Sequence, residues 1–366
     1  MLLLMDFPKP VHGMSNINLA MKERFVLEVE GVSIINTVPS YLSSFFGTKL
    51  WVLAKFIHSV FVFARVVLYF LLGGGRLLYR PVNGGFGQVY DIVYSGVSRL
   101  FGGSIFFHHH SFNYLNKKSF MFRTLLRVAG GDVKHVVLGD VMKKQLVSIY
   151  GVDADSVFVV SNAAFFKASD AILDARSNVE CVKLGFISNL CYEKGVDVFL
   201  EVCHELKRRE VSFSASLAGP YLDVSVQKDV EEALRLLPEL EYLGPLYGED
   251  KDKFFSSLDA FVFPSRNEAE PLVLYEAAEK GTFLIGTKVG CVEEVLGKLD
   301  GVSVCPPLRE AVVEVIERSI VKGEFDIEAR ERRVEMFRES KEMSYLDLDR
   351  LVRDMKNYEL SKTRQL

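Results

Sequence analysis

Short apolar runs alternate along this chain with longer stretches in which apolar residues recur at helical spacing. In the first half the runs lie at residues 2–7, 32–38, 74–82, 104–110, 133–139 and 156–162. In the second half they lie at residues 181–188, 211–219, 240–244, 259–265, 281–287 and 302–306. Strands that alternate with helices predict parallel sheets built from βαβ units.

The same rhythm occurs twice, with a break near residues 162–178, and 366 residues suffice for two domains at roughly 150 residues each. We therefore predict an α/β fold of two Rossmann-like, doubly wound domains facing a central cleft. The N-terminal domain covers residues 1–165 and the C-terminal domain residues 166–344. Residues 345–366 are charged and helical in pattern, so they either return to the first domain or form a solvated tail.

One apolar segment, residues 50–72, is long enough to span a bilayer but contains Lys55, His58 and Arg65. At helical spacing these three groups fall within an arc of about 80°, opposite a wide apolar surface. Three interpretations stay open: a helix buried between a sheet and its neighbours, a helix lying in the membrane interface, and a membrane span. A span is disfavoured because it would bury two charges.

Composition narrows the function classes. Hydrophobic residues make up 49% and charged residues 25%, which is typical of a globular protein. A net charge of -4 argues against a nucleic-acid partner, because neutralising phosphates needs a basic surface. The five cysteines contain no Cys-x-x-Cys pair, so neither a disulfide framework nor a structural zinc site is expected. We expect a cytoplasmic protein, peripheral at the inner face of the membrane if residues 50–72 touch lipid.

Ligands of open parallel sheets bind beyond the carboxyl ends of the strands, so the loops after the apolar runs are the candidate sites. Gly13, in the first such loop, either lets a phosphate approach the backbone or forms a plain turn. The loop after residues 104–110 carries three histidines, of which His108 and His110 share a strand face. A structural histidine and a polar site residue are both open, while a metal site lacks a further ligand nearby in sequence.

Two loops in the second half are more informative. Lys194 and Gly195 stand where a helix begins directly after a strand. A cation at a helix N-terminus is favourable only beside an anionic ligand. The alternative is that Lys194 is an exposed loop lysine without such a ligand. After the strand at residues 259–263, Pro271 suits a first helical position. Glu268 and Glu276 stand eight positions apart in this region. They either bind a ligand or stabilise the N-terminus of the helix with their negative charge.

These residues together resemble glycosyltransferase family 4, retaining enzymes of the GT-B fold that include bacterial cell-surface polysaccharide glycosyltransferases. The family typically carries two glutamates separated by seven residues after a strand ending in Pro-Ser, and Glu268-AEPLVLY-Glu276 has that spacing. It also carries Arg, four residues, Lys-Gly, of which Lys194-Gly195 is present. The Gly13 loop, His110 and the linker asparagine Asn162 look like the matching features of the N-terminal domain.

The resemblance implies transfer of a sugar from a UDP- or GDP-sugar to an acceptor hydroxyl with retention, without a metal or other cofactor. It places His110, Lys194 and Glu268 in catalytic roles, with His110 at a sugar hydroxyl, Lys194 at the leaving diphosphate and Glu268 at the donor sugar. Glu276 would hold the ribose. The donor-binding set it implies is Gly13, Asn189, Gly195, Glu268, Ala269, Glu270, Pro271, Leu272 and Glu276.

Two departures from the family pattern bear on activity. Asn189 stands where the family usually has arginine, so one cationic contact to the diphosphate is missing. Ala269, Glu270 and Pro271 replace glycines, and Pro271 has no N–H to donate. A non-catalytic sugar-nucleotide binder or partner subunit is therefore one alternative, and a nucleotide-sugar epimerase of the same fold is another. The apolar segment 50–72 suggests a lipid-linked glycan as the acceptor.

Overall fold

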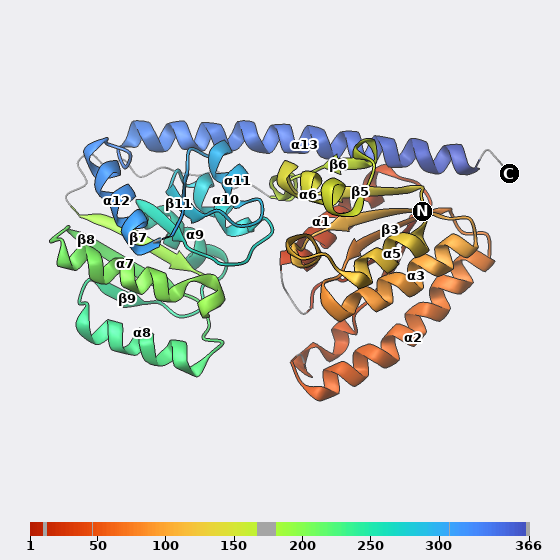
Figure 1. The fold of residues 1–366 in the computed structure, drawn as a ribbon, viewed down its shortest axis with the longest axis horizontal. Helices are drawn as coiled ribbons and strands as arrows, with labels where there is room; N and C mark the ends of the chain where they lie inside the picture. Colours follow the sequence, from red (N-terminus) through yellow and green to blue (C-terminus); the bar gives the residue numbers. More distant parts are fainter. Residues whose placement is uncertain (10–12, 46, 167–180, 307, 364–366) are drawn as a thin grey trace. The chain divides into compact units, whose positions relative to one another are not determined.

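The computed structural model describes residues 1–9, 13–45, 47–166, 181–306 and 308–363 of the chain, shown in Figure 1. These residues divide into two compact units. Unit 1 comprises residues 1–165 together with residues 344–366, and unit 2 comprises residues 166–343. The C-terminal segment therefore returns to the first unit rather than forming a solvated tail.

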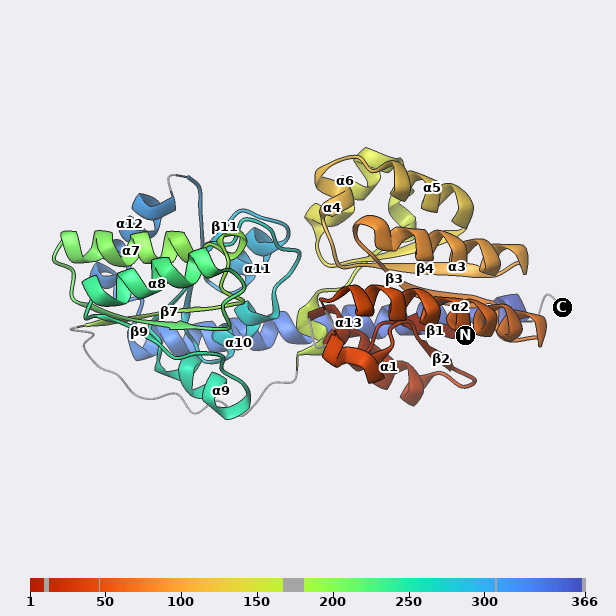
Figure 2. The same cartoon turned by 90° about the horizontal axis from the view of Figure 1, so that it is seen from below.

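Unit 1 contains a six-stranded parallel sheet in the order β2-β1-β3-β4-β5-β6. Its strands are β1 (Leu2–Met5), β2 (Ser33–Asn36), β3 (Leu77–Val82), β4 (Ser104–His109), β5 (Val133–Val137) and β6 (Val157–Val159). Its helices are α1 (Gly13–Glu28), α2 (Lys49–Leu71), α3 (Gln88–Leu100), α4 (Asn113–Asn116), α5 (Phe120–Ala129) and α6 (Asp140–Tyr150), with short 3-10 turns η1 (Ser40–Phe45), η2 (Gly85–Gly87), η3 (Ala154–Ser156) and η4 (Asn162–Phe165). In Figure 2, α6, α5, α3 and α2 lie side by side in one layer over this sheet.

Unit 2 repeats the architecture with a second six-stranded parallel sheet in the order β12-β11-β10-β7-β8-β9. Its strands are β7 (Val182–Ile187), β8 (Phe213–Ala218), β9 (Leu240–Tyr242), β10 (Ala260–Phe263), β11 (Phe283–Thr287) and β12 (Val302–Val304). Its helices are α7 (Val196–Arg208), α8 (Val224–Leu236), α9 (Gly248–Ser257), α10 (Leu272–Glu279), α11 (Val292–Lys298) and α12 (Leu308–Val321), with the 3-10 turn η5 (Tyr192–Lys194) before α7. Each of the twelve apolar runs contains a strand, and the predicted two-sheet α/β fold is confirmed.

The last helix, α13 (Ile327–Thr363), contributes to both units. In unit 2, the guanidinium of Arg330 donates to the carbonyl oxygens of Leu258 (2.8 Å) and Lys280 (3.0 Å), and Arg333 donates to that of Gly281 (2.9 Å). These carbonyls follow α9 and α10, so the two buried arginines satisfy acceptors that the ends of both helices leave open. In unit 1, α13 adds apolar side chains to the core beside α1 and β1.

The packing of helix α2 decides against one of its three interpretations. It packs through Trp51, Ser59, Val62, Val66 and Phe70, and most of its remaining apolar side chains are exposed, so the interpretation as a buried helix is wrong. The polar residues that share one side of this helix, Lys55, His58 and Arg65, do not all face water. The first two of them, the half-buried Lys55 and His58, lie on the protein side, where the His58 ring hydrogen-bonds the carbonyl oxygen of Asn36 (3.1 Å).

Within the described residues, α2 is also the one helix whose length and hydropathy would allow it to cross a membrane, and 22% of its most apolar window is buried. Length and composition do not separate a span from an interfacial helix.

Candidate functional site

In unit 2, the candidate site is built where the loops after two neighbouring strands, β7 and β10, touch. Gly195 has a left-handed backbone (φ +81°), and a Cβ atom there would lie 2.2 Å from the carbonyl oxygen of Pro264. Only glycine permits that approach. Glycine is therefore required at position 195 by the packing. The close approach that it permits brings Lys194 beside the loop that follows β10.

Lys194 and Glu268 meet at this junction. The ammonium Nζ of Lys194 lies 2.5 Å from Oε1 of Glu268, and both side chains are largely buried. The hydroxyl of Ser265, two residues after the end of β10, donates to the same carboxylate oxygen (3.2 Å). Two residues predicted from separate loops to serve one ligand are thus in direct contact. The lysine is held in place, and its charge is partly neutralised by the carboxylate.

A second close approach fixes the backbone that carries Glu268. Gly290 has φ +54°, and a Cβ atom there would lie 2.1 Å from the carbonyl oxygen of Glu268. The N–H of Cys291 donates to the carbonyl oxygen of Ala269 (2.8 Å), so the loop before α11 braces the loop before α10. Glu270 is buried and accepts a hydrogen bond from the hydroxyl of Tyr275 (2.6 Å), which makes it a structural carboxylate in this structure.

Helix α10 begins one residue later than predicted. Pro271 is the N-cap, with an extended backbone and no side-chain cap, and Leu272 is the first helical residue. Glu276 lies in the middle of this short helix rather than at its start, and its carboxylate pairs with Nζ of Lys251 at 2.6 Å. About a quarter of each side chain in that pair is exposed, so Glu276 remains reachable by a ligand.

The remaining predicted residue of this unit, Asn189, follows β7 and is exposed. A cation that sequence reasoning missed, Arg266, lies in the β10–α10 loop and binds both carboxylate oxygens of Asp197 (2.8 and 2.7 Å). That bidentate pairing holds Arg266 against the first turn of α7. The sequence carries no signal for it, because the two residues are far apart along the chain.

In unit 1, Gly13 is the first residue of α1, and the preceding residues 10–12 of its loop lie outside the described residues. A Cβ atom at Gly13 would meet no atom within 4 Å. Among the described residues, the packing of unit 1 therefore does not require glycine at this position. The function predicted for Gly13, room for an anionic group, stays a prediction.

The histidines of β4 divide between two faces, as predicted from strand alternation. The rings of His108 and His110 lie 4.0 Å apart between centroids, while His109 points to the other side, where its Nε2 lies 2.9 Å from Nδ1 of His135. Burial lowers the pKa values of His108 and His109 well below the usual range, and that of His135 to about 3. Half-buried His110, just after the strand, is the member of the set nearest to solvent.

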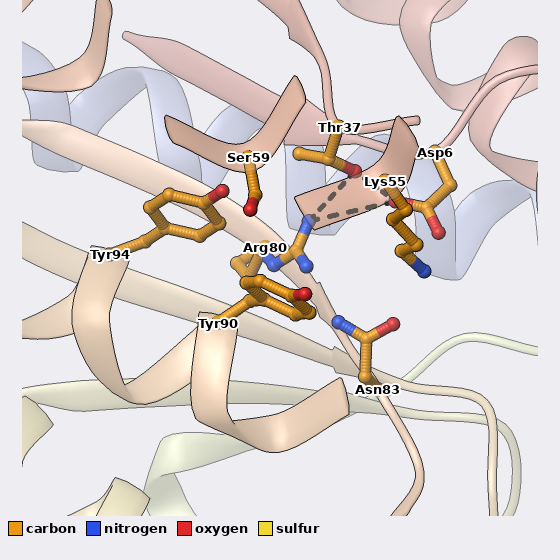
Figure 3. A pocket seen from close by; sticks show the side chains of 8 residues that line it. All are labelled: Asp6, Thr37, Lys55, Ser59, Arg80, Asn83, Tyr90 and Tyr94. Atoms are coloured by element: carbon orange, nitrogen blue, oxygen red, sulfur yellow. Dashed lines mark hydrogen bonds and ion pairs between the residues drawn. The ribbon is translucent and has the colours of Figure 1, made fainter. Parts of the chain in front are cut away.

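A polar pocket that sequence reasoning did not predict lies at the carboxyl edge of the unit 1 sheet (Figure 3). At its base, Arg80 is buried and pairs with Asp91 at 2.8 Å, and its Nη1 lies 3.9 Å from Asp6. The charged Arg80 within the apolar run at residues 74–82 was a signal that could have found it. The pocket is lined by Asp6, Thr37, Lys55, Ser59, Arg80, Asn83, Tyr90 and Tyr94.

Metal ligands do not gather in either unit: among the described residues no group of three or more His, Cys, Asp or Glu side chains is placed to hold an ion. The five cysteines are all free. The donor set seen at both candidate sites instead consists of lysine, arginine, carboxylate, hydroxyl and backbone groups, which suits the binding of phosphates and sugar hydroxyls.

Comparison with solved structures shows the fold. Anabaena HepE in complex with UDP superposes with a TM-score of 0.64, covering 100% of both chains at 15% identity. Sucrose-phosphate synthase from Thermosynechococcus elongatus gives a TM-score of 0.72 at 14% identity, covering 97% of this chain and 98% of that one. Both are glycosyltransferase-fold neighbours, in agreement with the predicted GT-B architecture.

Curated relatives resemble the chain over about half of its length. A human subunit of phosphatidylinositol N-acetylglucosaminyltransferase is 24% identical over 218 residues, which is 59% of this chain and 44% of that protein. The D-inositol 3-phosphate glycosyltransferase of Saccharomonospora viridis is 29% identical over 176 residues, covering 42% of this chain and 39% of that protein. The chain thus spans less than half the length of either relative.

The family match coincides with unit 2 and with its candidate site. Residues 174–339 match the family described as "Glycosyl transferases group 1", a range that contains Lys194, Glu268 and Glu276. This match agrees with the expectation of a glycosyltransferase, and it covers most of unit 2 but less than half of the chain.

Proposed function

We propose that this protein is a retaining glycosyltransferase of family 4 that moves a sugar from a UDP- or GDP-sugar to a hydroxyl of a lipid-linked glycan acceptor. The observation that carries the proposal is the contact between Lys194 and Glu268 in a domain of the glycosyl transferases group 1 family. Unit 2 then binds the donor and unit 1 the acceptor. HepE, a structural neighbour, was solved with UDP and with UDP-glucose, which supports a nucleotide-sugar donor.

The chemistry proposed for unit 2 is stabilisation of negative charge. When the bond between the sugar and the diphosphate breaks, charge develops on the leaving oxygens, and a fixed cation close to them lowers the barrier. Lys194 supplies that cation, and Glu268 holds its side chain in position before the donor arrives. The start of α7 at Val196 has no side-chain cap, so its backbone N–H groups are available to the same anion. With this charge supplied by the protein, we expect transfer to need no metal.

The chemistry proposed for unit 1 is recognition of a polyhydroxy ring. The pocket of Figure 3 combines the carboxylate of Asp6, the amide of Asn83 and two tyrosines, a combination of hydrogen-bonding groups and flat apolar faces that suits a sugar or cyclitol. The relatives' names specify phosphatidylinositol and inositol 3-phosphate as their substrates. The pocket itself has room for about one water molecule, so we propose that an acceptor ring of this class contacts its rim and that His110 contacts a hydroxyl of the donor sugar.

A non-catalytic partner subunit remains the alternative, because the human relative is named as one component of a transferase, and because Asn189 and Pro271 depart from the family pattern. An epimerase of the same fold would convert the donor without any acceptor.

The test separates these functions in one set of incubations. The purified protein is mixed with UDP- and GDP-sugars, with and without phosphatidylinositol or a polyprenyl-linked sugar, in the presence of EDTA. Glycolipid formation with an unchanged anomeric configuration supports the proposal. A protein that binds nucleotide but shows neither transfer nor slow donor hydrolysis is a non-catalytic binder. Conversion of the donor sugar in the absence of an acceptor identifies an epimerase.

A nucleotide-binding measurement tests Glu276 directly. Because a ligand that binds only the folded state raises the melting temperature, UDP or GDP should stabilise the wild-type protein. Glu276→Ala should remove most of this shift, since the ribose loses its acceptor, while Lys251→Ala should keep it. If Glu276→Ala keeps the full shift, Glu276 is not part of the donor site.

A further inference from the structure

The charge of this protein is distributed unevenly. The chain has 48 Asp and Glu residues, yet residues 31–131 contain a single one, Asp91. That carboxylate is fully buried and paired with Arg80, so this segment presents no acidic side chain to solvent. The same segment contains ten of the lysines and arginines: Lys49, Lys55, Arg65, Arg76, Arg80, Arg99, Lys117, Lys118, Arg123 and Arg127. A protein with a net charge of -4 thus has a segment that is strongly positive.

The fold gathers this segment on one side of unit 1. It contains α2, α3 and α5, which Figure 2 shows side by side in the layer over one face of the sheet. The layer therefore has cations and apolar groups on its outer surface but no carboxylate from these three helices. A surface of one sign attracts an extended surface of the opposite sign, because the attractions add without local repulsion.

The outer side of α2 is apolar over its whole length. Side chains that are half exposed or more include Leu50, Val52, Leu53, Phe56, Val60, Phe61, Leu68 and Leu71. Their spacing places most of them on the side of the helix opposite its packed residues, in a band that runs for all of its 23 residues. Such a band is larger than the scattered apolar residues of an ordinary soluble surface, so it indicates a contact.

The second feature of the layer is a basic pocket between α5 and α6. Its lining includes Lys118, Arg123 and Arg127, together with Tyr150. The three cations are exposed, and within the described residues none of them has a carboxylate partner. Three unpaired cations around one open hollow suit a phosphate group at a membrane surface.

We propose that the layer of α2, α3 and α5 is a docking surface for an anionic lipid bilayer. The apolar side of α2 enters the interface between head groups and acyl chains, and the pocket at Arg123 and Arg127 binds the phosphate of an anionic head group. The charge complementarity favours a bilayer over a second copy of this chain, because two copies of so positive a surface repel each other. The inference does not depend on the proposed transferase activity.

The experiment is flotation of the full-length protein with phosphatidylcholine vesicles, with or without phosphatidylglycerol. We expect binding to the anionic vesicles at low salt. Arg123→Gln with Arg127→Gln should weaken the partition coefficient about 30-fold on anionic vesicles, given the contribution of each cation near such a surface, and have little effect on neutral ones. Phe56→Gln with Phe61→Gln should weaken binding at least about tenfold on both vesicle types, including the part that survives high salt.

Matched controls carry the same chemical changes in unit 2. Lys228→Gln with Lys322→Gln removes two exposed cations, and Leu236→Gln with Val321→Gln removes two exposed apolar groups. Both controls should bind vesicles like the wild type. Because all of the substituted side chains are exposed, circular dichroism should show unchanged folding.

Three results would overturn the inference. One is wild-type protein that stays in solution with both vesicle types. Another is equal recovery of the wild type and both unit 1 variants on anionic vesicles. The third is a dimer in light scattering that the Phe56/Phe61 variant abolishes, which would make a second copy the partner of α2.

Discussion

The contact between Lys194 and Glu268 explains how a lysine is tolerated beside a helix N-terminus. The partial positive charge of the first turn of α7 repels a cation, and the Glu268 carboxylate at 2.5 Å offsets that repulsion. An arriving diphosphate would share the lysine with the carboxylate. Glu268 therefore has two functions in our proposal, to orient Lys194 in the free protein and to contact the donor sugar in the complex.

Substitution of Lys194 tests this arrangement. Lys194→Ala should lower kcat by about 10²-fold or more, the usual loss when one fixed donor to developing charge is removed. Redundancy is low, because Asn189 carries no charge and Arg266 is bound to Asp197. The measurement is initial-rate kinetics with saturating donor.

Lys183→Ala, which removes an exposed lysine from β7, serves as the control and should leave kcat unchanged. Transfer by Lys194→Ala at a near-normal rate would show that other groups neutralise the diphosphate.

Sequence reasoning named candidate site residues, but it could not predict the contacts between them. Spacing in the chain was enough to single out Lys194, Gly195, Glu268 and Glu276, because each follows an apolar strand pattern. It could not show that Gly195 touches Pro264, or that Lys251 pairs with Glu276, because these contacts join segments far apart in sequence. The roles of His110 and Gly13 in transfer remain predictions.

The strands were the most predictable elements, since buried parallel strands read as continuous apolar runs. Helix α2 was the least predictable. Its composition is the same whether the apolar side is buried or exposed, and only the packing of Ser59, Val62 and Val66 against the unit decides which side faces inward. The hydrophobic pattern gives the period of a helix but not its partner.

Within β3, Arg80 connects the pocket of Figure 3 to the stability of unit 1. Removing one partner of a buried ion pair leaves the other charge uncompensated, so Arg80→Ala should destabilise unit 1 by about 3–5 kcal/mol. Urea unfolding followed by the fluorescence of Trp51, the single tryptophan, reports on this unit.

The exposed pair of Arg332 and Asp300 provides the comparison, and Arg332→Ala should cost about 1 kcal/mol or less. A small effect of Arg80→Ala would mean that Asp91 is protonated or reached by water.

Strands β4 and β5 make unit 1 sensitive to acid. Burial lowers the pKa values of His108, His109 and His135, so the folded unit keeps these imidazoles neutral while the unfolded chain protonates them below about pH 6.5. The contribution of the three neutral histidines to the free energy of unfolding is complete above that pH and is lost as the pH falls toward about 3. Each histidine should remove about 1.4 kcal/mol per pH unit in this window.

Urea midpoints at about pH 7.5 and about pH 5.5 give the slope. His135→Gln keeps a polar partner for His109 but cannot titrate, so it should reduce the slope by about one third whatever its effect on stability at neutral pH. An unchanged slope would exclude His135 as a source of acid sensitivity.

The core of unit 1, unlike that of unit 2, depends on the C-terminal part of helix α13. Beyond Met343 it supplies Leu348, Leu351, Val352 and Met355 to the core of unit 1, and the carboxylate of Glu359 pairs with the N-terminal amine at 2.9 Å. Unit 1 therefore closes its core with residues that are synthesised after all of unit 2. Its folding depends on the last segment of the chain.

Deletion of residues 344–366 should unfold unit 1 and leave unit 2 folded. Four buried apolar side chains, worth roughly 2–5 kcal/mol each, together match or exceed the stability of about 5–15 kcal/mol that a domain usually has. Leu351→Ala alone should cost about 2–5 kcal/mol in the Trp51 unfolding curve, whereas Leu346→Ala, an exposed position on the same helix, should cost less than about 0.5 kcal/mol. A truncated chain whose Trp51 still unfolds cooperatively at the wild-type midpoint would show that α13 is not part of the unit 1 core, because a helix that fills a core cannot be removed without loss of cooperativity.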